Sequence, residues 1–397
     1  MAKPKLALIP AAQGTKLYSV LPSNGTGDFT FTRGSVATRI NAQGLIENVA
    51  SGVSRLDYPM IDGVQKGCPH HILEPARTNL ILNSQKISLT PTKAGTFVDN
   101  FAISPDGTLN ATKLTATDVD PYFYQNISYS AVSYTASIYI KGIGNSVGKE
   151  FQIRLGTNIY TDVIPLEWTR FKYTVTMASG VTSAGLEIPN PAVVGDEVLV
   201  WGWQVEVGSY VTSYIPTNGE SGGVTRSAET ASGAGNSTTF NDSEGVLMAE
   251  ISALANDSTN RQMTLSDGTN DNRLVLKYDN QSNIIQSFNR ISGVESAFLS
   301  ASVTDITLFS KCLVKYKVND YQLWINGFKL DTDTSASVWP TSTLNDLRIN
   351  AGGGADFYGN VKQLQYFDSA IADTQLEQLT SWTSFTDMAN GQLYTIE

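Results

Sequence analysis

Short segments in which apolar and polar residues alternate run through most of the chain, and turn residues separate them. In the segment 151–155, Phe-Gln-Ile-Arg-Leu, the three apolar side chains share one face and the two polar side chains share the other. The same period of two recurs at 134–141, 169–177 and 197–207. Such strands pack in pairs of sheets, so the pattern predicts an all-β fold built from β-sandwich or jelly-roll domains.

The composition favours the same fold class. Only 16% of the residues are charged, and Ser, Thr, Asn and Gly replace the Lys and Glu of solvent-facing helices. A chain of 397 residues is long enough for two or three domains.

We expect four successive parts. Residues 1–83 form a small β-rich block with little apolar sequence, which we expect to pack against the next domain or another subunit. Residues 84–228 form a jelly-roll sandwich, residues 229–243 are small and polar and read as a linker, and residues 244–397 form a second sandwich of the concanavalin A-like type.

The last part has the clearest local signals. Asn326-Gly327 supplies the two positive φ values of a type I′ hairpin turn. Leucines three residues apart predict a short helix over 373–379. The strands expected here are 245–253, 273–278, 312–318, 321–325 and 361–367.

The charge balance excludes some partners. The formal net charge is −10 and the sequence pI is about 4.8, which disfavours a protein that binds the phosphate backbone of a nucleic acid. No apolar run is long enough to span a bilayer, and the run Leu6–Ile9 ends at Pro10, too short for a secretory signal. We therefore expect a protein made in a cytoplasm. Cys68 and Cys312 alone cannot form a disulfide framework.

The segments that resemble catalytic motifs lack the partner residues that catalysis would need. The segments 144–148, Gly-Asn-Ser-Val-Gly, and 219–223, Gly-Glu-Ser-Gly-Gly, resemble nucleophile turns. A serine nucleophile needs a histidine base, and the only histidines, His70 and His71, are adjacent and have no supporting motif. We therefore expect no enzyme activity, and both strings indicate Gly-rich turns.

No metal ion or cofactor is expected. Neighbouring residues on a strand point to opposite faces, so His70 and His71 cannot easily bind one ion and indicate a surface or interface pair. The segment that begins at Asp331 starts like a calcium loop, but Ala336 and Ser342 stand where such a loop needs Gly and Glu.

Glycan binding is the ligand hypothesis that the pattern of side chains allows. A glycan site needs aromatic platforms with polar groups on an accessible face. The alternatives are an ordinary solvated sheet face and a subunit contact. Because Trp201, Trp203 and Val205 alternate with other residues along one predicted strand, we expect them to share a face and to lie in the core. The candidate glycan-binding residues are Ser137, Tyr139, Gln152, Arg154, Gln204 and Glu206 on the outward face, and the aromatic pair Tyr122 and Tyr124.

Two stretches near the N-terminus resemble a block found in bacteriophage head fibres, head spikes and tail fibres. They are 31–41, Phe-Thr-Arg-Gly-Ser-Val-Ala-Thr-Arg-Ile-Asn, and 73–80, Leu-Glu-Pro-Ala-Arg-Thr-Asn-Leu, with Arg55-Leu-Asp57-Tyr and Cys68-Pro69 between them. His70-His71 departs from the Ser-Leu that usually follows Cys-Pro. The resemblance implies a virion protein whose N-terminal block attaches to the particle, and by analogy a trimer.

Two later stretches resemble sandwich families. Residues 200–217 are similar to the last strand and exit of carbohydrate-binding-module-like jelly rolls. Leu323 to Gly327, Phe357 to Val361 and Leu376 to Leu379 look like the concanavalin A/laminin-G sandwich, although the E-x-D-x-x-E strand of its glycoside hydrolases is absent. The function expected is a head-fibre, decoration or tail-fibre protein. The alternatives are a host-glycan adhesin and, third, a glycan depolymerase.

Overall fold

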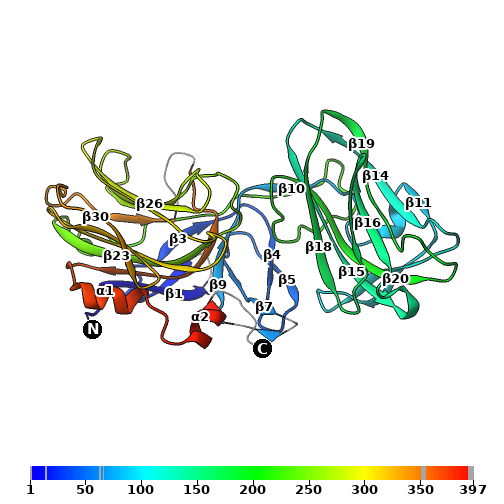
Figure 1. Cartoon of the computed structure of the whole chain (residues 1–397), viewed down its shortest axis with the longest axis horizontal. Coiled ribbons are helices and arrows are strands. Elements are labelled where there is room, and N and C mark those ends of the chain that lie inside the picture. The colour runs from blue at the N-terminus through cyan, green and yellow to red at the C-terminus, as the bar shows by residue number, and fades with distance from the viewer. Residues whose placement is uncertain (1, 14–15, 62–63, 66, 350–354, 392–397) are drawn as a thin grey trace.

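The computed structural model describes residues 2–13, 16–61, 64–65, 67–349 and 355–391. Two β lobes lie side by side, and short strands from the N-terminal part run between them (Figure 1). The predicted all-β class and its sandwiches are confirmed, because every ladder between named strands is antiparallel. No helix in these ranges is long and apolar enough to cross a bilayer.

The first lobe is a sandwich of two five-stranded sheets. Its strands include all four that the alternation predicts. Phe123, Phe151 and Trp203 are among the side chains that fill the space between the sheets. One sheet has the order β11 (Thr92–Ala94), β14 (Tyr122–Tyr129), β19 (Gly180–Glu187), β16 (Glu150–Leu155) and β17 (Asn158–Val163). The other has the order β12 (Thr96–Ile103), β13 (Leu109–Thr115), β20 (Glu197–Val207), β15 (Ser133–Ile143) and β18 (Thr169–Thr176).

The second lobe pairs a five-stranded sheet with a larger one. The five-stranded sheet runs β27 (Val294–Ser302), β26 (Ile284–Ile291), β25 (Arg273–Tyr278), β24 (Arg261–Ser266) and β31 (Asp346–Arg348). The centre of the larger sheet is β32 (Gly359–Phe367), β23 (Glu244–Ala253), β28 (Ser310–Lys317), β29 (Tyr321–Ile325) and β30 (Phe328–Asp333). Asn326 and Gly327 have φ values of 50° and 90°, as the predicted hairpin turn requires.

Strands from the N-terminus complete the larger sheet of the second lobe. β1 (Leu6–Gln13) pairs with β32, and the sheet continues through β2 (Lys16–Leu21) and β3 (Phe29–Thr32). On its far side β3 pairs with β22 (Thr230–Ser232). The segment 229–243, which the composition predicts to be a linker, is therefore part of the fold: its small residues allow close packing, and Ala231 and Ala234 are buried in the same core.

Short strands occupy the space between the lobes. β6 (Arg55–Asp57) pairs with β9 (His70–Leu73), which continues onto β32, and β10 (Arg77–Asn79) pairs with β21 (Val224–Arg226). Two hairpins, β4 (Ala37–Ile40) with β5 (Ile46–Val49) and β7 (Met60–Ile61) with β8 (Val64–Gln65), lie beside them. His70 and His71 are buried in this region, not on the surface: β9 lies between the lobes, where it pairs with β6 and β32, and the His70 ring packs against Phe309.

Helices are few and short among the described residues. The predicted helix is α1 (Asp373–Thr380), whose Leu376 packs on the outer face of the larger sheet beside Trp324. α2 (Phe385–Gly391) follows it. Two single turns of 3₁₀-helix, η1 (Ile87–Leu89) and η2 (Gly144–Ser146), lie in the first lobe.

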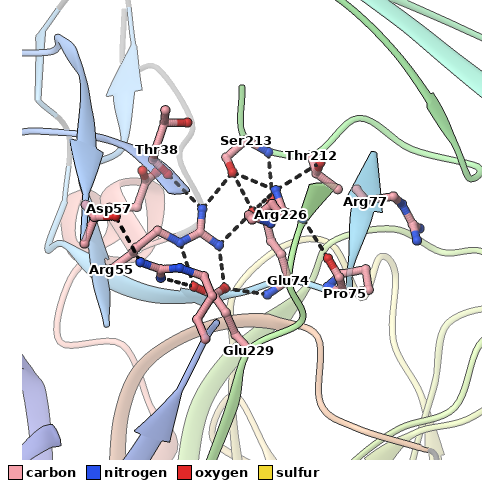
Figure 2. Close-up of polar contacts among 12 residues, drawn as sticks. Thr38, Arg55, Asp57, Glu74, Pro75, Arg77, Thr212, Ser213, Arg226 and Glu229 are labelled. Atoms are coloured by element: carbon pink, nitrogen blue, oxygen red, sulfur yellow. Dashed lines mark hydrogen bonds and ion pairs between the residues drawn. The ribbon is translucent and has the colours of Figure 1, made fainter. Parts of the chain in front are cut away.

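A buried ionic network joins the two lobes to the strands between them (Figure 2). Arg55 is its centre: its guanidinium donates to Glu74 at 2.7 Å and to Glu229 at 2.8 Å. Arg33 binds the same Glu229 at 2.7 Å, and Arg226 lies 2.8 Å from Glu74. These five side chains are at most 2% exposed.

The buried ions of the network are hydrogen-bonded as well as paired by charge. Ser213, in the segment that leaves β20, donates both its backbone N–H and its hydroxyl to Glu74. The backbone N–H of Glu74 donates to Glu229. Burial alone would raise the pKa of Glu74, but Arg226 and Arg55 outweigh it and hold that pKa at about 2. Glu74 is therefore ionised at neutral pH, and its charge is hydrogen-bonded as a buried charge must be.

Replacing Glu229 by Gln should destabilise the protein strongly. Glu229→Gln removes the carboxylate that Arg33 and Arg55 share, and breaking a buried ion pair costs about 3–5 kcal/mol. The matched control is Glu47→Gln, because Glu47 pairs with Arg39 where both side chains are partly exposed. That change should cost less than about 1 kcal/mol. Urea unfolding followed by fluorescence measures both, and equal losses would contradict the role of the network.

Replacing Asp57 by Asn should change how stability depends on pH. Burial raises the pKa of Asp57 to about 6, from 3.8, although the backbone N–H of Ile40 donates to its carboxylate. Between these values the folded protein keeps a proton that the unfolded chain loses, so rising pH destabilises the fold. In the variant Asp57→Asn, the amide oxygen would keep the hydrogen bond without titrating.

The unfolding free energy of the wild type, relative to Asp57→Asn, should therefore fall by about 2 kcal/mol between pH 4 and pH 7. Urea unfolding of both proteins at several pH values provides the measurement. The difference isolates Asp57 from His70 and Glu74, whose own titrations are common to both proteins. A difference that stays constant across this range would show that Asp57 is ionised normally.

Candidate functional site

Two stacked tyrosines lie on the outer face of the first lobe. Tyr122 and Tyr124 are two residues apart on β14, so they point to the same side of the sheet, away from the core residue Phe123. Their ring centroids are 4.9 Å apart and the rings are inclined by 24°. Both side chains are half-buried, so the pair presents a partly accessible aromatic surface.

Gly185 on the neighbouring strand β19 makes room for this surface. It is the cross-strand partner of Tyr124. A Cβ atom at Gly185 would lie 1.9 Å from the Tyr124 ring and 2.3 Å from the backbone oxygen of Phe123. Only glycine therefore allows the ring of Tyr124 to lie across β19.

A polar group next to the tyrosines centres on Glu187. Arg154, on β16, lies 2.7 Å from one oxygen of Glu187 and donates through Nη2 to the other oxygen at 2.7 Å. The same Nη2 donates to Gln152, and the hydroxyl of Tyr124 donates to Glu187. Asn190 also donates to this carboxylate at 2.9 Å. The side chain of Arg154 is 29% exposed, so the guanidinium is held in place and remains accessible.

The electrostatics keep Tyr124 a hydrogen-bond donor. Burial and the bond to Glu187 raise the pKa of Tyr124 above its usual value of 10. An aromatic pair beside a fixed arginine and an amide is the combination that stacks on a sugar ring and binds its hydroxyl groups. Chemically, this face can bind a polar ring.

The predicted site residues divide between opposite faces of the sandwich. Tyr122, Tyr124, Gln152 and Arg154 come together as described above. Gln204 is on the other sheet and is completely buried. Its side chain accepts the backbone N–H of Ile215.

Glu206, two residues further along β20, is completely buried too, so neither residue lies on an accessible face. Glu206 binds Thr212 through both the backbone N–H, at 2.8 Å, and the hydroxyl, at 2.6 Å. The exit segment 209–217 folds back over β20, which the period of two along one strand cannot reveal. Ser137 is also buried, and it accepts a hydrogen bond from Arg170.

Tyr139 lies in a cleft between the lobes, apart from the other predicted site residues. The cleft has a volume of about 330 Å³ and is lined by residues of both lobes and of the strands between them. Its polar wall includes Asp57, His70 and Arg170. His70 Nε2 lies 3.9 Å from Asp57, and burial lowers the pKa of His70 to about 3, so the imidazole is neutral.

The two tryptophans of β20 are both buried, as expected, but on opposite faces. Trp203 lies between the sheets, whereas Trp201 packs against Tyr214 and Ile46 on the outer side. A register shift in the β15–β20 pairing falls here, and Gly202 has a φ of 67°. This bulge changes which residues face outward, so the expectation that Trp201, Trp203 and Val205 share a face is wrong.

The serine strings lie in turns. Ser146 is completely buried in η2, where its hydroxyl accepts the backbone N–H of Glu197 at 3.0 Å. Ser221 is exposed in the turn that precedes β21. Among the described residues, no group of three His, Cys, Asp or Glu side chains is arranged to hold a metal ion.

Three important residues have only weak sequence signals. Glu187 and Gly185 lie on β19. Apolar and polar residues alternate there only from Ser183 onward, and Gly and Ala weaken the pattern. Glu229 is the first residue of the predicted linker, yet it is the central carboxylate of the ionic network. An Arg-x-x-Glu spacing at Arg226 and Glu229, in a stretch otherwise poor in charge, is the signal that could have identified it.

No protein-family model matches the chain, and no curated protein matches it. Solved structures do resemble parts of it. The Ruminococcus gnavus IT-sialidase CBM40, bound to α2,3-sialyllactose, covers 36% of this chain and 85% of its own, with 17% identity and a TM-score of 0.31. Domain 4 of AbnA, a GH43 extracellular arabinanase from Geobacillus stearothermophilus in complex with arabinotriose, covers 39% and 73%, with 9% identity and a TM-score of 0.32. Mouse laminin α1 domains LG4-5 cover 72% and 96%, with 8% identity and a TM-score of 0.25.

Proposed function

We propose that this chain is a non-enzymatic structural protein of a bacteriophage particle, whose first lobe binds a glycan of the host surface. The observation that carries glycan binding is the stacked pair Tyr122 and Tyr124 beside the fixed guanidinium of Arg154. This face joins an apolar platform to hydrogen-bonding groups within one sheet. The virion role is supported by the resemblance of 31–41 and 73–80 to the block of head and tail fibres.

The absence of catalysis is part of the same proposal. The hydroxyl of Ser146 is used as an acceptor within the fold, and His70 is a neutral side chain in the cleft between the lobes. A host-glycan adhesin is the alternative in which binding itself is the selected role. A glycan depolymerase is the third, and it requires turnover of a host polysaccharide by the purified protein.

Removing one ring of the aromatic pair should abolish measurable glycan binding. A glycan array of bacterial surface polysaccharides identifies a ligand for the wild type, and titration of that ligand compares the variants. Tyr124→Ala should weaken binding more than tenfold, the effect expected of a central aromatic contact. Arg154→Lys keeps the charge but loses the planar fork, so it should weaken binding too.

The matched control is Val181→Ala, which removes an exposed apolar side chain from the same face of β19. It should leave the affinity unchanged. An array without any bound polysaccharide would reject glycan binding, and an equal loss in Val181→Ala would place the ligand elsewhere. Either result leaves the virion proposal standing.

The virion role has a separate test. Particles made with and without this protein should differ by an appendage in electron cryomicroscopy, with residues 1–83 nearest the particle. The purified protein should be a trimer by light scattering. Particles of identical appearance in both preparations would reject the structural role, and a monomer would reject the trimer.

A further inference from the structure

Two arginines face each other on the outer surface of the second lobe. Arg273 on β25 and Arg290 on β26 are direct cross-strand partners. Leu274 and Ile285, which point to the opposite side, belong to the core between the sheets. β26 lies in the layer on the opposite side of this lobe from α1 (Figure 1). Like charges directly opposite each other destabilise a sheet, so this pair needs an explanation.

The two arginines form no ion pair within the part of the chain that the structure describes. Neighbouring cations are paired: Lys277 with Asp279 at 2.7 Å, and Arg348 with Asp346. Arg273 donates to the amide oxygen of Asn270, and no described carboxylate forms an ion pair with it or with Arg290.

Two carboxylates come near the pair. Asp271 lies two residues before Arg273 in the chain, and Glu295 is the cross-strand partner of Arg290. Both are exposed to solvent. Burial and the charge of Arg290 lower the pKa of Arg273, and Asp271 only partly opposes this shift. Asp271 and Glu295 balance the formal charge of the two arginines, but neither forms an ion pair with them, so both guanidinium groups remain available to the carboxylate of a ligand.

Each arginine also has an unused donor. The Nε atoms of Arg273 and Arg290 are buried, and neither has a hydrogen-bond partner among the described residues. Because these Nε atoms are inaccessible, a ligand would meet the terminal Nη groups of the two guanidinium ions. A planar guanidinium presents its N–H groups in a fork that matches the two oxygens of a carboxylate.

Aromatic rings adjoin the arginines. Phe288 is buried beneath three cations, with Arg273, Lys277 and Arg290 at 5.4, 5.9 and 5.8 Å from its ring centroid. Its cross-strand partner Phe298 is 48% exposed. An exposed ring beside a fixed pair of guanidinium groups suits a ligand with both a carboxylate and an apolar ring face.

We infer that the second lobe carries a site for the carboxylate of an acidic saccharide, formed by Arg273 and Arg290 with Phe298 as the platform for the sugar ring. This site is separate from the tyrosine face and does not depend on it. A nucleic acid is the less suitable polyanion, because a single pair of arginines on an acidic protein cannot follow a phosphate backbone.

The test measures binding of polygalacturonate to the full chain by titration calorimetry. Fully methyl-esterified polygalacturonate has the same backbone without the charge and serves as the ligand control. The wild type should bind the acid and not the ester. Arg273→Gln and Arg290→Gln should each weaken binding about tenfold or more, the loss expected for a charged hydrogen bond.

Lys317→Gln is the protein control, because it removes one exposed positive charge from the same lobe, and it should bind as the wild type does. Thermal unfolding of Arg290→Gln should show undiminished stability, since the change relieves a repulsion, so lost binding would not reflect misfolding.

Four results would overturn the inference. They are no binding of polygalacturonate by the wild type, equal binding of the ester, equal losses in Lys317→Gln and Arg290→Gln, and a loss in Tyr124→Ala that Arg290→Gln does not share. The last result would move the anion site to the first lobe. Tighter binding of a single-stranded oligonucleotide than of polygalacturonate would also reject the saccharide.

Discussion

The carboxylate of Glu229 and the guanidinium of Arg55 form the contact on which the arrangement of the whole chain depends. Several segments meet around this contact. They are the loop after β3, the strand β6, the end of β9, the exit of β20 and the segment that leads into β22. Each ion is buried, so each must have a partner or its burial would cost several kcal/mol. The two lobes are consequently joined by an interaction that forms only when all these segments are in position. Apolar contacts alone would tolerate more relative movement.

This network also gives physical meaning to the sequence resemblance. Arg33, Arg55 and Glu74 all lie in the N-terminal stretches that carry this resemblance, and all three are buried in the network. In this chain the three residues meet a requirement of folding, because a charged residue of the network cannot be exchanged without leaving its partner unpaired.

Period-two alternation predicts the strands well and the accessible faces poorly. Strands such as β16 and β25 are recognisable because one face of each is a core face. Whether the other face is exposed depends on what folds over it. β20 shows the limit: the segment 209–217 covers Gln204 and Glu206, and the bulge at Gly202 reverses the outward side partway along the strand. The covering segment is a long-range effect that the residues of β20 do not encode, whereas the glycine within the strand is a local signal of the bulge.

Half of the predicted site residues lie together because their strands are paired in one sheet. Tyr124 and Arg154 are 30 residues apart in sequence and meet only through β19, which supplies Glu187 and the space above Gly185. In the second lobe, Arg273 and Arg290 likewise meet because their strands are adjacent in one sheet. Because the ionic network holds the lobes together, a polysaccharide that reaches both faces would bind the second at a high effective concentration. Two weak contacts would then give firm attachment. Under that condition an exposed sheet face is sufficient for binding, and a deep pocket is not needed.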